Sequence, residues 1–117
     1  MQITYKIYEN RMGVAYKVSD NPGINPKQEY NGNLRSVPVV GMRFRCGTLS
    51  TNIVARIIEE SSNSGTCMTI SGSVYKWEIT TDDLVHKLSA VEIPPRVITA
   101  LKEFKKKQGI KKYIKKL

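Results

Sequence analysis

The sequence holds few of the side chains that carry catalytic or metal chemistry. It has one histidine, His86, and two cysteines, Cys46 and Cys67. A closed structural zinc site takes four Cys or His ligands, so three such side chains exclude one. Glycine-rich phosphate loops, paired-carboxylate spacings and Ser/His/Asp arrangements are also absent from the sequence. We therefore expect a protein that is not an enzyme, with no catalytic residue, no cofactor and no metal.

A Cys/His pair is the one nucleophilic arrangement that the composition leaves open. Cys46 and Cys67 both fall within strand-like segments, where a buried thiol behaves as a small apolar residue, and we favour that interpretation. His86 is best interpreted as a surface or packing residue. Whether the cysteines form a disulfide stays open, although two cysteines without an export signal favour a reducing compartment.

Long apolar runs are absent as well. The longest uncharged apolar run covers about four residues, 37–40, and includes Pro38. A transmembrane helix needs ~20 mostly apolar residues, and a secretory signal peptide has an apolar centre of ~7–15 residues. We therefore expect no membrane span and a cytoplasmic location.

Negative charge is scarce at the C-terminal end. The 117 residues carry a net charge of +9. Residues 1–95 account for only +1 of it, whereas residues 96–117 hold nine basic side chains and a single acid, Glu103. Such asymmetry indicates a polyanion, an acidic protein face or an anionic membrane as the partner.

Two-residue alternation of apolar and polar side chains predicts a β-hairpin over residues 1–20. Ile3, Tyr5 and Ile7 share one face of its first strand. Residues 21–36 contain several turn dipeptides and are predicted to form an irregular loop, in which Asn31-Gly32 is a candidate hairpin turn.

The pattern of residues 37–90 predicts a small barrel-like core of short strands, in which residues 80–90 form a short helix after the last strand. Leu84, Val85 and Leu88 would face the body from that helix. The segments "VGMRFRC" and "VYKWEITTDDL" follow the order of strands in small SH3-like barrels, so residues 37–88 resemble that fold. Barrels of this kind carry many functions, so the resemblance implies a fold and no activity.

The C-terminal residues 94–117 predict basic helices that begin at Pro94-Pro95. Gly109 would end the first helix. A second helix would carry an apolar stripe that docks on the body or forms a homodimer, composed of Ile110, Tyr113, Ile114 and Leu117. Taken together, residues 1–117 predict a single α+β domain: a hairpin, a small bent antiparallel sheet or SH3-like barrel, and basic helices.

The candidate binding residues lie mostly in this basic tail. Eight lysines fall within fifteen residues: Lys102, Lys105, Lys106, Lys107, Lys111, Lys112, Lys115 and Lys116. Lysine binds phosphate as a point charge, so these side chains would hold a DNA or RNA backbone without reading bases. Arg43 and Arg45 share a strand face and form a second candidate patch, and Tyr113 is a further candidate contact. We therefore expect a nucleic-acid-binding protein.

The alternative hypothesis is a protein-binding function. Small basic chains without catalytic motifs resemble phage or mobile-element accessory proteins, including inhibitors of host nucleic-acid-processing complexes such as anti-CRISPR proteins. The basic tail would then occupy an acidic protein surface. A short amphipathic helix at a membrane interface is the third hypothesis.

Overall fold

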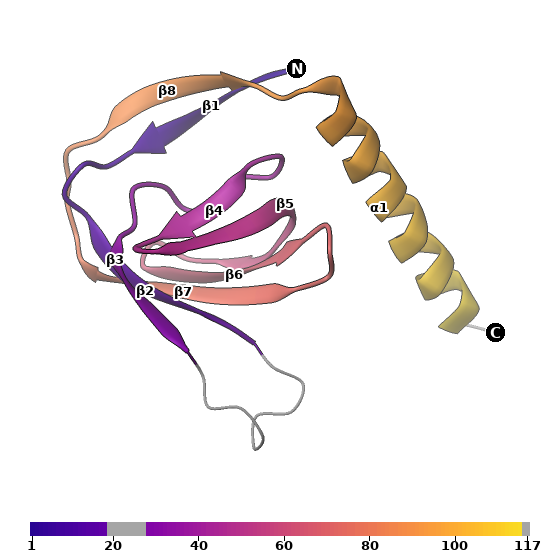
Figure 1. Ribbon diagram of the computed structural model, residues 1–117, viewed down its shortest axis with the longest axis horizontal. Coiled ribbons are helices and arrows are strands. Elements are labelled where there is room, and N and C mark those ends of the chain that lie inside the picture. Colours follow the sequence, from indigo (N-terminus) through magenta and orange to yellow (C-terminus); the bar gives the residue numbers. More distant parts are fainter. Residues whose placement is uncertain (19–27, 116–117) are drawn as a thin grey trace.

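The computed structural model describes residues 1–18 and 28–115, with side chains described as far as Gln108. Eight strands and one helix make up this part of the chain (Figure 1). They are β1 (Gln2–Ile7), β2 (Met12–Lys17), β3 (Glu29–Asn33), β4 (Arg43–Cys46), β5 (Leu49–Glu60), β6 (Ser64–Thr69), β7 (Val74–Thr81), β8 (Lys87–Glu92) and α1 (Pro95–Lys115). No helix in these ranges is both long and apolar enough to span a bilayer.

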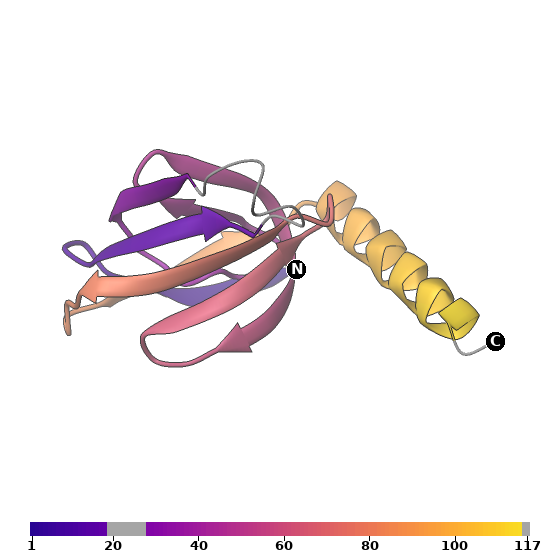
Figure 2. The same cartoon turned by 90° about the horizontal axis from the view of Figure 1, so that it is seen from below.

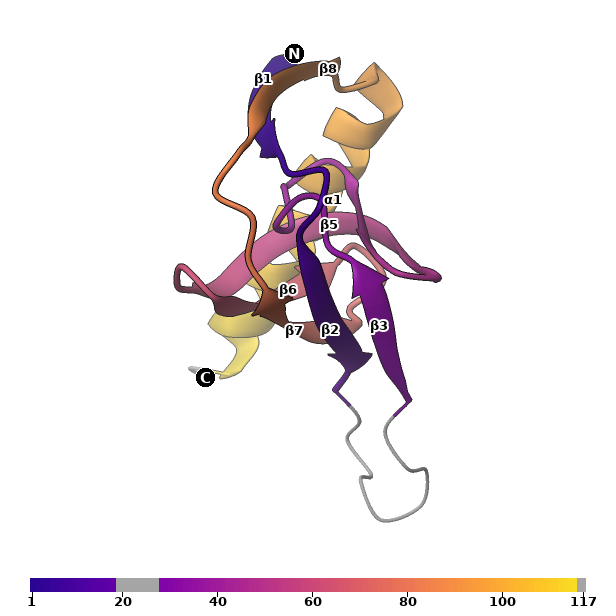
Figure 3. The same cartoon turned by 90° about the vertical axis from the view of Figure 1, so that its left-hand side faces the viewer.

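Six strands form one antiparallel sheet in the order β3-β2-β7-β6-β5-β4. The sheet curls until its two edge strands meet, which makes it a nearly closed barrel (Figures 1 and 3). At the seam the amide of Gly47 donates to the carbonyl of Asn33 at 3.1 Å. The expectation of a small bent sheet is confirmed at this level, although β2 and β3 belong to it as well as the strands after residue 37.

The core lies inside the curled sheet because each strand turns one face inward. Along β4, Phe44 and Cys46 are buried and Arg43 and Arg45 are exposed, as two-residue alternation requires. The buried core residues are Ala15, Leu34, Phe44, Cys46, Leu49, Val54, Cys67 and Trp77. Both cysteines are free.

A separate two-stranded ribbon of β1 and β8 passes over the outside of the barrel (Figures 1 and 3). The two strands are antiparallel, with a register that runs from Gln2↔Glu92 to Ile7↔Lys87. The amino terminus forms an ion pair with Glu92 at 2.8 Å. This ribbon, called the β1–β8 ribbon below, leads directly into α1.

The predicted hairpin over residues 1–20 is wrong in its pairing. β1 pairs with β8, whereas β2 pairs with β3 and β7. The chain leaves the ribbon at Tyr8, whose amide donates to the carbonyl of Arg35, and Leu34 donates to the carbonyl of Arg11. These two bonds direct the chain from the ribbon into the barrel. Alternation had identified two strands but not their partners.

The irregular loop predicted over residues 21–36 is wrong in its last part, because β3 lies there and pairs with β2. Asn31-Gly32 is inside that strand and forms no turn. Residues 21–27 of the predicted loop, and residues 19–20 of the predicted hairpin, lie outside the described residues.

The helix predicted over residues 80–90 is also wrong. β7 continues to Thr81, and a connection without regular structure leads to β8. Asp83 holds this connection in place. One of its carboxylate oxygens accepts a hydrogen bond from the amide of Val85 at 3.1 Å, and the other accepts one from the amide of Asn10 at 3.2 Å. Side-chain bonds of this type compete with helix formation. Leu84, Val85 and Leu88 do not face the body but are exposed.

The C-terminal segment is one continuous helix rather than two, because α1 runs through Gly109 to Lys115. It starts beside β5 and extends away from the barrel (Figures 1 and 2). Its first turns carry the half-buried side chains of Val97, Ile98, Leu101 and Phe104. The apolar stripe from Ile110 to Leu117, which was expected to dock or dimerise, lies outside the described side chains.

Candidate nucleic-acid interface

The first candidate surface is the middle of α1. Lys102, Lys105, Lys106 and Lys107 are all exposed on it. Among the described residues, ion pairs form between the amino terminus and Glu92 and between Lys87 and Glu9, so none of these four lysines is neutralised by one. Four free ammonium groups on a helix that extends from the body form a surface that an extended polyanion can reach.

The remaining predicted lysines are only partly covered by the structure. The backbone of Lys111, Lys112 and Lys115 is helical, but their side chains lie outside the described part. The same holds for the side chain of Tyr113. Lys116 lies entirely outside the described residues.

The second candidate surface is a cleft of about 680 Å³ between the β1–β8 ribbon and the barrel. Its residues come from β1, the end of β3, the segment between β3 and β4, β4 itself, the turn after β4, and β5. They are Tyr5, Ile7, Asn33, Arg35, Ser36, Val37, Val39, Met42, Arg43, Phe44, Arg45, Gly47 and Ile53. We call it the arginine cleft, because it contains three arginines and no acidic residue.

The outward face of β4 places two of these arginines. Arg43 and Arg45 alternate with buried Phe44 and Cys46, so both guanidinium groups stay outside the core. Arg43 donates one hydrogen bond to the carbonyl of Thr51 at 3.0 Å, which fixes the side chain against β5. A guanidinium has five donors, so most of those of Arg43 remain for a ligand.

The cleft is not purely polar. Tyr5 and Ile7 face it from the ribbon, and both are half-buried. Val37, Val39 and Met42 contribute apolar surface from the barrel side and are also half-buried. The site therefore combines cationic donors with apolar surface, which suits a ligand that carries both an anion and an apolar or aromatic group.

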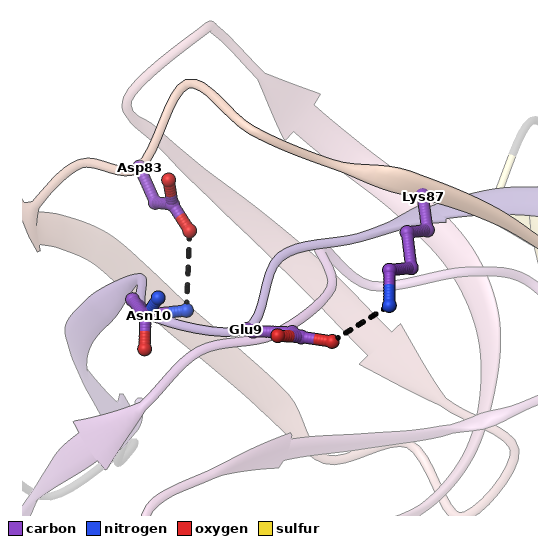
Figure 4. A network of polar contacts seen from close by, with 4 residues as sticks. All are labelled: Glu9, Asn10, Asp83 and Lys87. Carbon is purple, nitrogen blue, oxygen red and sulfur yellow. Dashed lines mark hydrogen bonds and ion pairs between the residues drawn. The ribbon is translucent and has the colours of Figure 1, made fainter.

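A polar network holds the ribbon where it leaves the barrel (Figure 4). Lys87 on β8 donates to Glu9 at 3.1 Å, and the backbone amide of Asn10 donates to Asp83 at 3.2 Å. The first contact joins the turn after β1 to the start of β8, and the second joins that turn to the connection before β8. Both hold the two strands together at one end of the ribbon, next to Ile7, which lines the cleft.

The ring of Tyr8, which is half-buried, already contacts two other side chains. The guanidinium of Arg11 lies 3.8 Å from the centre of its ring, and His86 lies against it with ring centroids 5.4 Å apart. Arg11 itself is buried, and its Nε donates to the carbonyl of Leu34 at 3.1 Å. Neither Arg11 nor Tyr8 lines the arginine cleft.

The two cysteines and His86 lie in different surroundings. Cys46 and Cys67 are in the barrel core, and His86 is exposed on the connection before β8. Burial raises the pKa of both thiols, that of Cys67 to about 11. Within the described residues no group of three or more His, Cys, Asp or Glu is placed to hold a metal.

Sequence reasoning found Arg43 and Arg45 but missed the ribbon side of the cleft. Their alternation with polar residues predicts only that Tyr5 and Ile7 share one face of a hairpin strand. No local signal could have placed them opposite Arg43, because β1 pairs with a strand 80 or more positions away: Ile7 lies opposite Lys87. The surrounding apolar residues, such as Val37 and Val39, were visible only as a short apolar run.

Comparison of the chain with protein-family models, with curated protein sequences and with solved structures found no match.

Proposed function

We propose that this protein binds nucleic acid without catalysis and holds the phosphate backbone through the lysines of α1. One observation carries the proposal: Lys102, Lys105, Lys106 and Lys107 are exposed on a helix that extends from the body, and no ion pair within the described part of the chain neutralises them. Each lysine that meets a phosphate releases a condensed counterion, which favours binding strongly at low salt.

The chemistry of these side chains supports backbone contact rather than sequence readout. A lysine ammonium is a point charge on a flexible stem, so it binds DNA and RNA phosphates alike. We also propose that the curled sheet is an SH3-like barrel, a scaffold that leaves function to surfaces of this kind.

The test compares two triple variants that lose the same charge. In the first, Lys105, Lys106 and Lys107 become Gln; in the second, the exposed Lys6, Lys17 and Lys76 of the strands become Gln. Binding of a fluorescent random-sequence duplex is measured by anisotropy. We expect the helix variant to bind ~100-fold more weakly than the wild type at ~0.1 M salt, and the strand variant much less so. Equal losses in both variants would contradict a role for α1 beyond net charge.

A second candidate function is protein binding, in which the chain acts as a small accessory protein that inhibits a host nucleic-acid-processing complex. The observation that favours it is an exposed apolar group near the start of β8: Leu84 is 88% exposed, Val85 74% and Leu88 70%. Apolar side chains gathered on a surface in this way are typical of interaction sites.

A pull-down from nuclease-treated lysate distinguishes the two candidate functions. A protein partner would be retained by the wild-type chain there and lost when Leu84 and Leu88 become Ser, whereas a nucleic-acid-bridged partner would disappear with the nuclease. The helix triple variant should leave a partner held by Leu84 and Leu88 in place.

A further inference from the structure

We infer that the arginine cleft seats an unpaired stretch of nucleic-acid strand, with phosphates at Arg35, Arg43 and Arg45 and bases against its apolar surface. The inference rests on the proposed function and goes further. The lysines of α1 would bind the phosphates of paired and unpaired strands alike, whereas the cleft would bind unpaired strands only. It names single-stranded nucleic acid as the preferred ligand.

Charge is the first argument. Three arginines line one cleft, and the residues that line it include no Asp or Glu. The recorded ion pairs of the described residues involve none of the three. Arginine presents a planar fork of donors that matches two phosphate oxygens, so an anionic ligand is favoured over a neutral one.

The apolar surface is the second argument. A simple anion would leave Tyr5, Ile7 and Met42 without a partner, although each is only half-buried at the cleft. A nucleotide supplies both parts, because its base has a flat apolar face and its phosphate is charged. Bases stack on aromatic rings such as that of Tyr5, and this stacking tolerates any sequence.

Size and access are the third argument. The volume of about 680 Å³ lies within the ~300–1,000 Å³ of pockets that take small organic ligands. It suits a few nucleotides of one strand. A duplex keeps its bases stacked inside, so it could present only its backbone to the cleft and would leave the apolar surface uncovered.

The test uses the full chain and two fluorescent probes, a short oligothymidylate and a random-sequence duplex. Arg45→Gln removes one cleft cation, and Arg56→Gln removes an exposed arginine of β5 that does not line the cleft. We expect Arg45→Gln to weaken oligothymidylate binding ~10-fold or more, to change duplex binding less than ~2-fold, and Arg56→Gln to change neither. Tyr5→Ala should also weaken oligothymidylate binding and leave duplex binding nearly unchanged. If Tyr5→Ala does not fold, the two arginine variants still test the inference.

The other outcomes are also decisive. Unchanged oligothymidylate binding in Arg45→Gln, with duplex binding intact, would overturn the inference and leave the proposed function standing. Displacement of oligothymidylate by a polyglutamate peptide of the same net charge would assign the cleft to acidic peptides. This result would overturn the inference as well. Absence of binding to either probe would overturn both the inference and the proposed function.

Discussion

The amide of Gly47, the residue that follows β4, donates to the carbonyl of Asn33 at the end of β3 at 3.1 Å, and this bond links the two edges of the six-stranded sheet. The strands approach so closely here that a Cβ on Gly47 would lie 2.5 Å from the carbonyl oxygen of Asn31. The seam matters for the proposed site because Gly47 and Asn33 both line the arginine cleft. Closure of the barrel and the shape of the cleft therefore depend on the same contact.

Gly47→Ala should destabilise the protein by more than the cost of placing alanine at the positive φ of this position. Gly47 has φ +58, and the added methyl group would also meet Asn31. Gly72→Ala is the matched control, since Gly72 has φ +87 but nothing within 4 Å of its Cβ position. We expect Gly72→Ala to cost about 1–2 kcal/mol and Gly47→Ala clearly more, as measured by urea unfolding. Equal costs would mean that the seam opens readily.

Arg11→Ala should be among the more damaging substitutions of a charged residue. Arg11 is only 4% exposed, donates to the carbonyl of Leu34 at 3.1 Å and covers the ring of Tyr8. Its removal leaves a buried carbonyl without that donor and a gap at the ring, so we expect a loss of about 2–4 kcal/mol in the free energy of unfolding. Arg56→Ala, at an exposed site, should change it by less than about 0.5 kcal/mol. A small effect of Arg11→Ala would instead implicate its Nη2, a buried donor without a partner, as a compensating cost.

Cys67 should make the fold sensitive to alkaline pH. Burial raises the pKa of its thiol from 9.0 to about 11, so the folded state holds the proton that the unfolded state releases first. The resulting stability is fully present below pH 9 and is lost as the pH rises towards 11. Unfolding free energies measured across that window should fall less steeply in Cys67→Ala than in the wild type. Identical slopes would contradict a buried, neutral thiol.

The sequence predicted strands well where one face is buried, and predicted their partners poorly. Arg43, Phe44, Arg45 and Cys46 alternate between water and core, so both the strand and the outward arginines could be recognised from local pattern. No pattern in the neighbouring sequence indicates that Tyr5 pairs with Ser89. The ribbon side of the cleft therefore depends on long-range pairing that periodicity cannot supply.

Helix signals near the C-terminal end were misleading for a related reason. Asp82 and Asp83 suit the first turn of a helix, but here Asp83 bonds to Asn10 and Val85 and stabilises a non-helical connection. Gly109 suits a helix end, yet α1 continues through it to Lys115. Single residues of these types favour a cap without requiring one, since glycine within a helix costs only about 1 kcal/mol relative to alanine.

The most direct test of the account is the salt dependence of duplex binding by the full chain. If Lys102, Lys105, Lys106 and Lys107 each meet a phosphate, the logarithm of the binding constant should fall linearly with the logarithm of salt concentration, with a slope of about −3.6 or steeper. Replacement of Lys105, Lys106 and Lys107 by Gln should bring that slope about 2.7 units closer to zero. A flat salt dependence, or a slope that the triple variant leaves unchanged, would contradict the claim that α1 holds a nucleic-acid backbone.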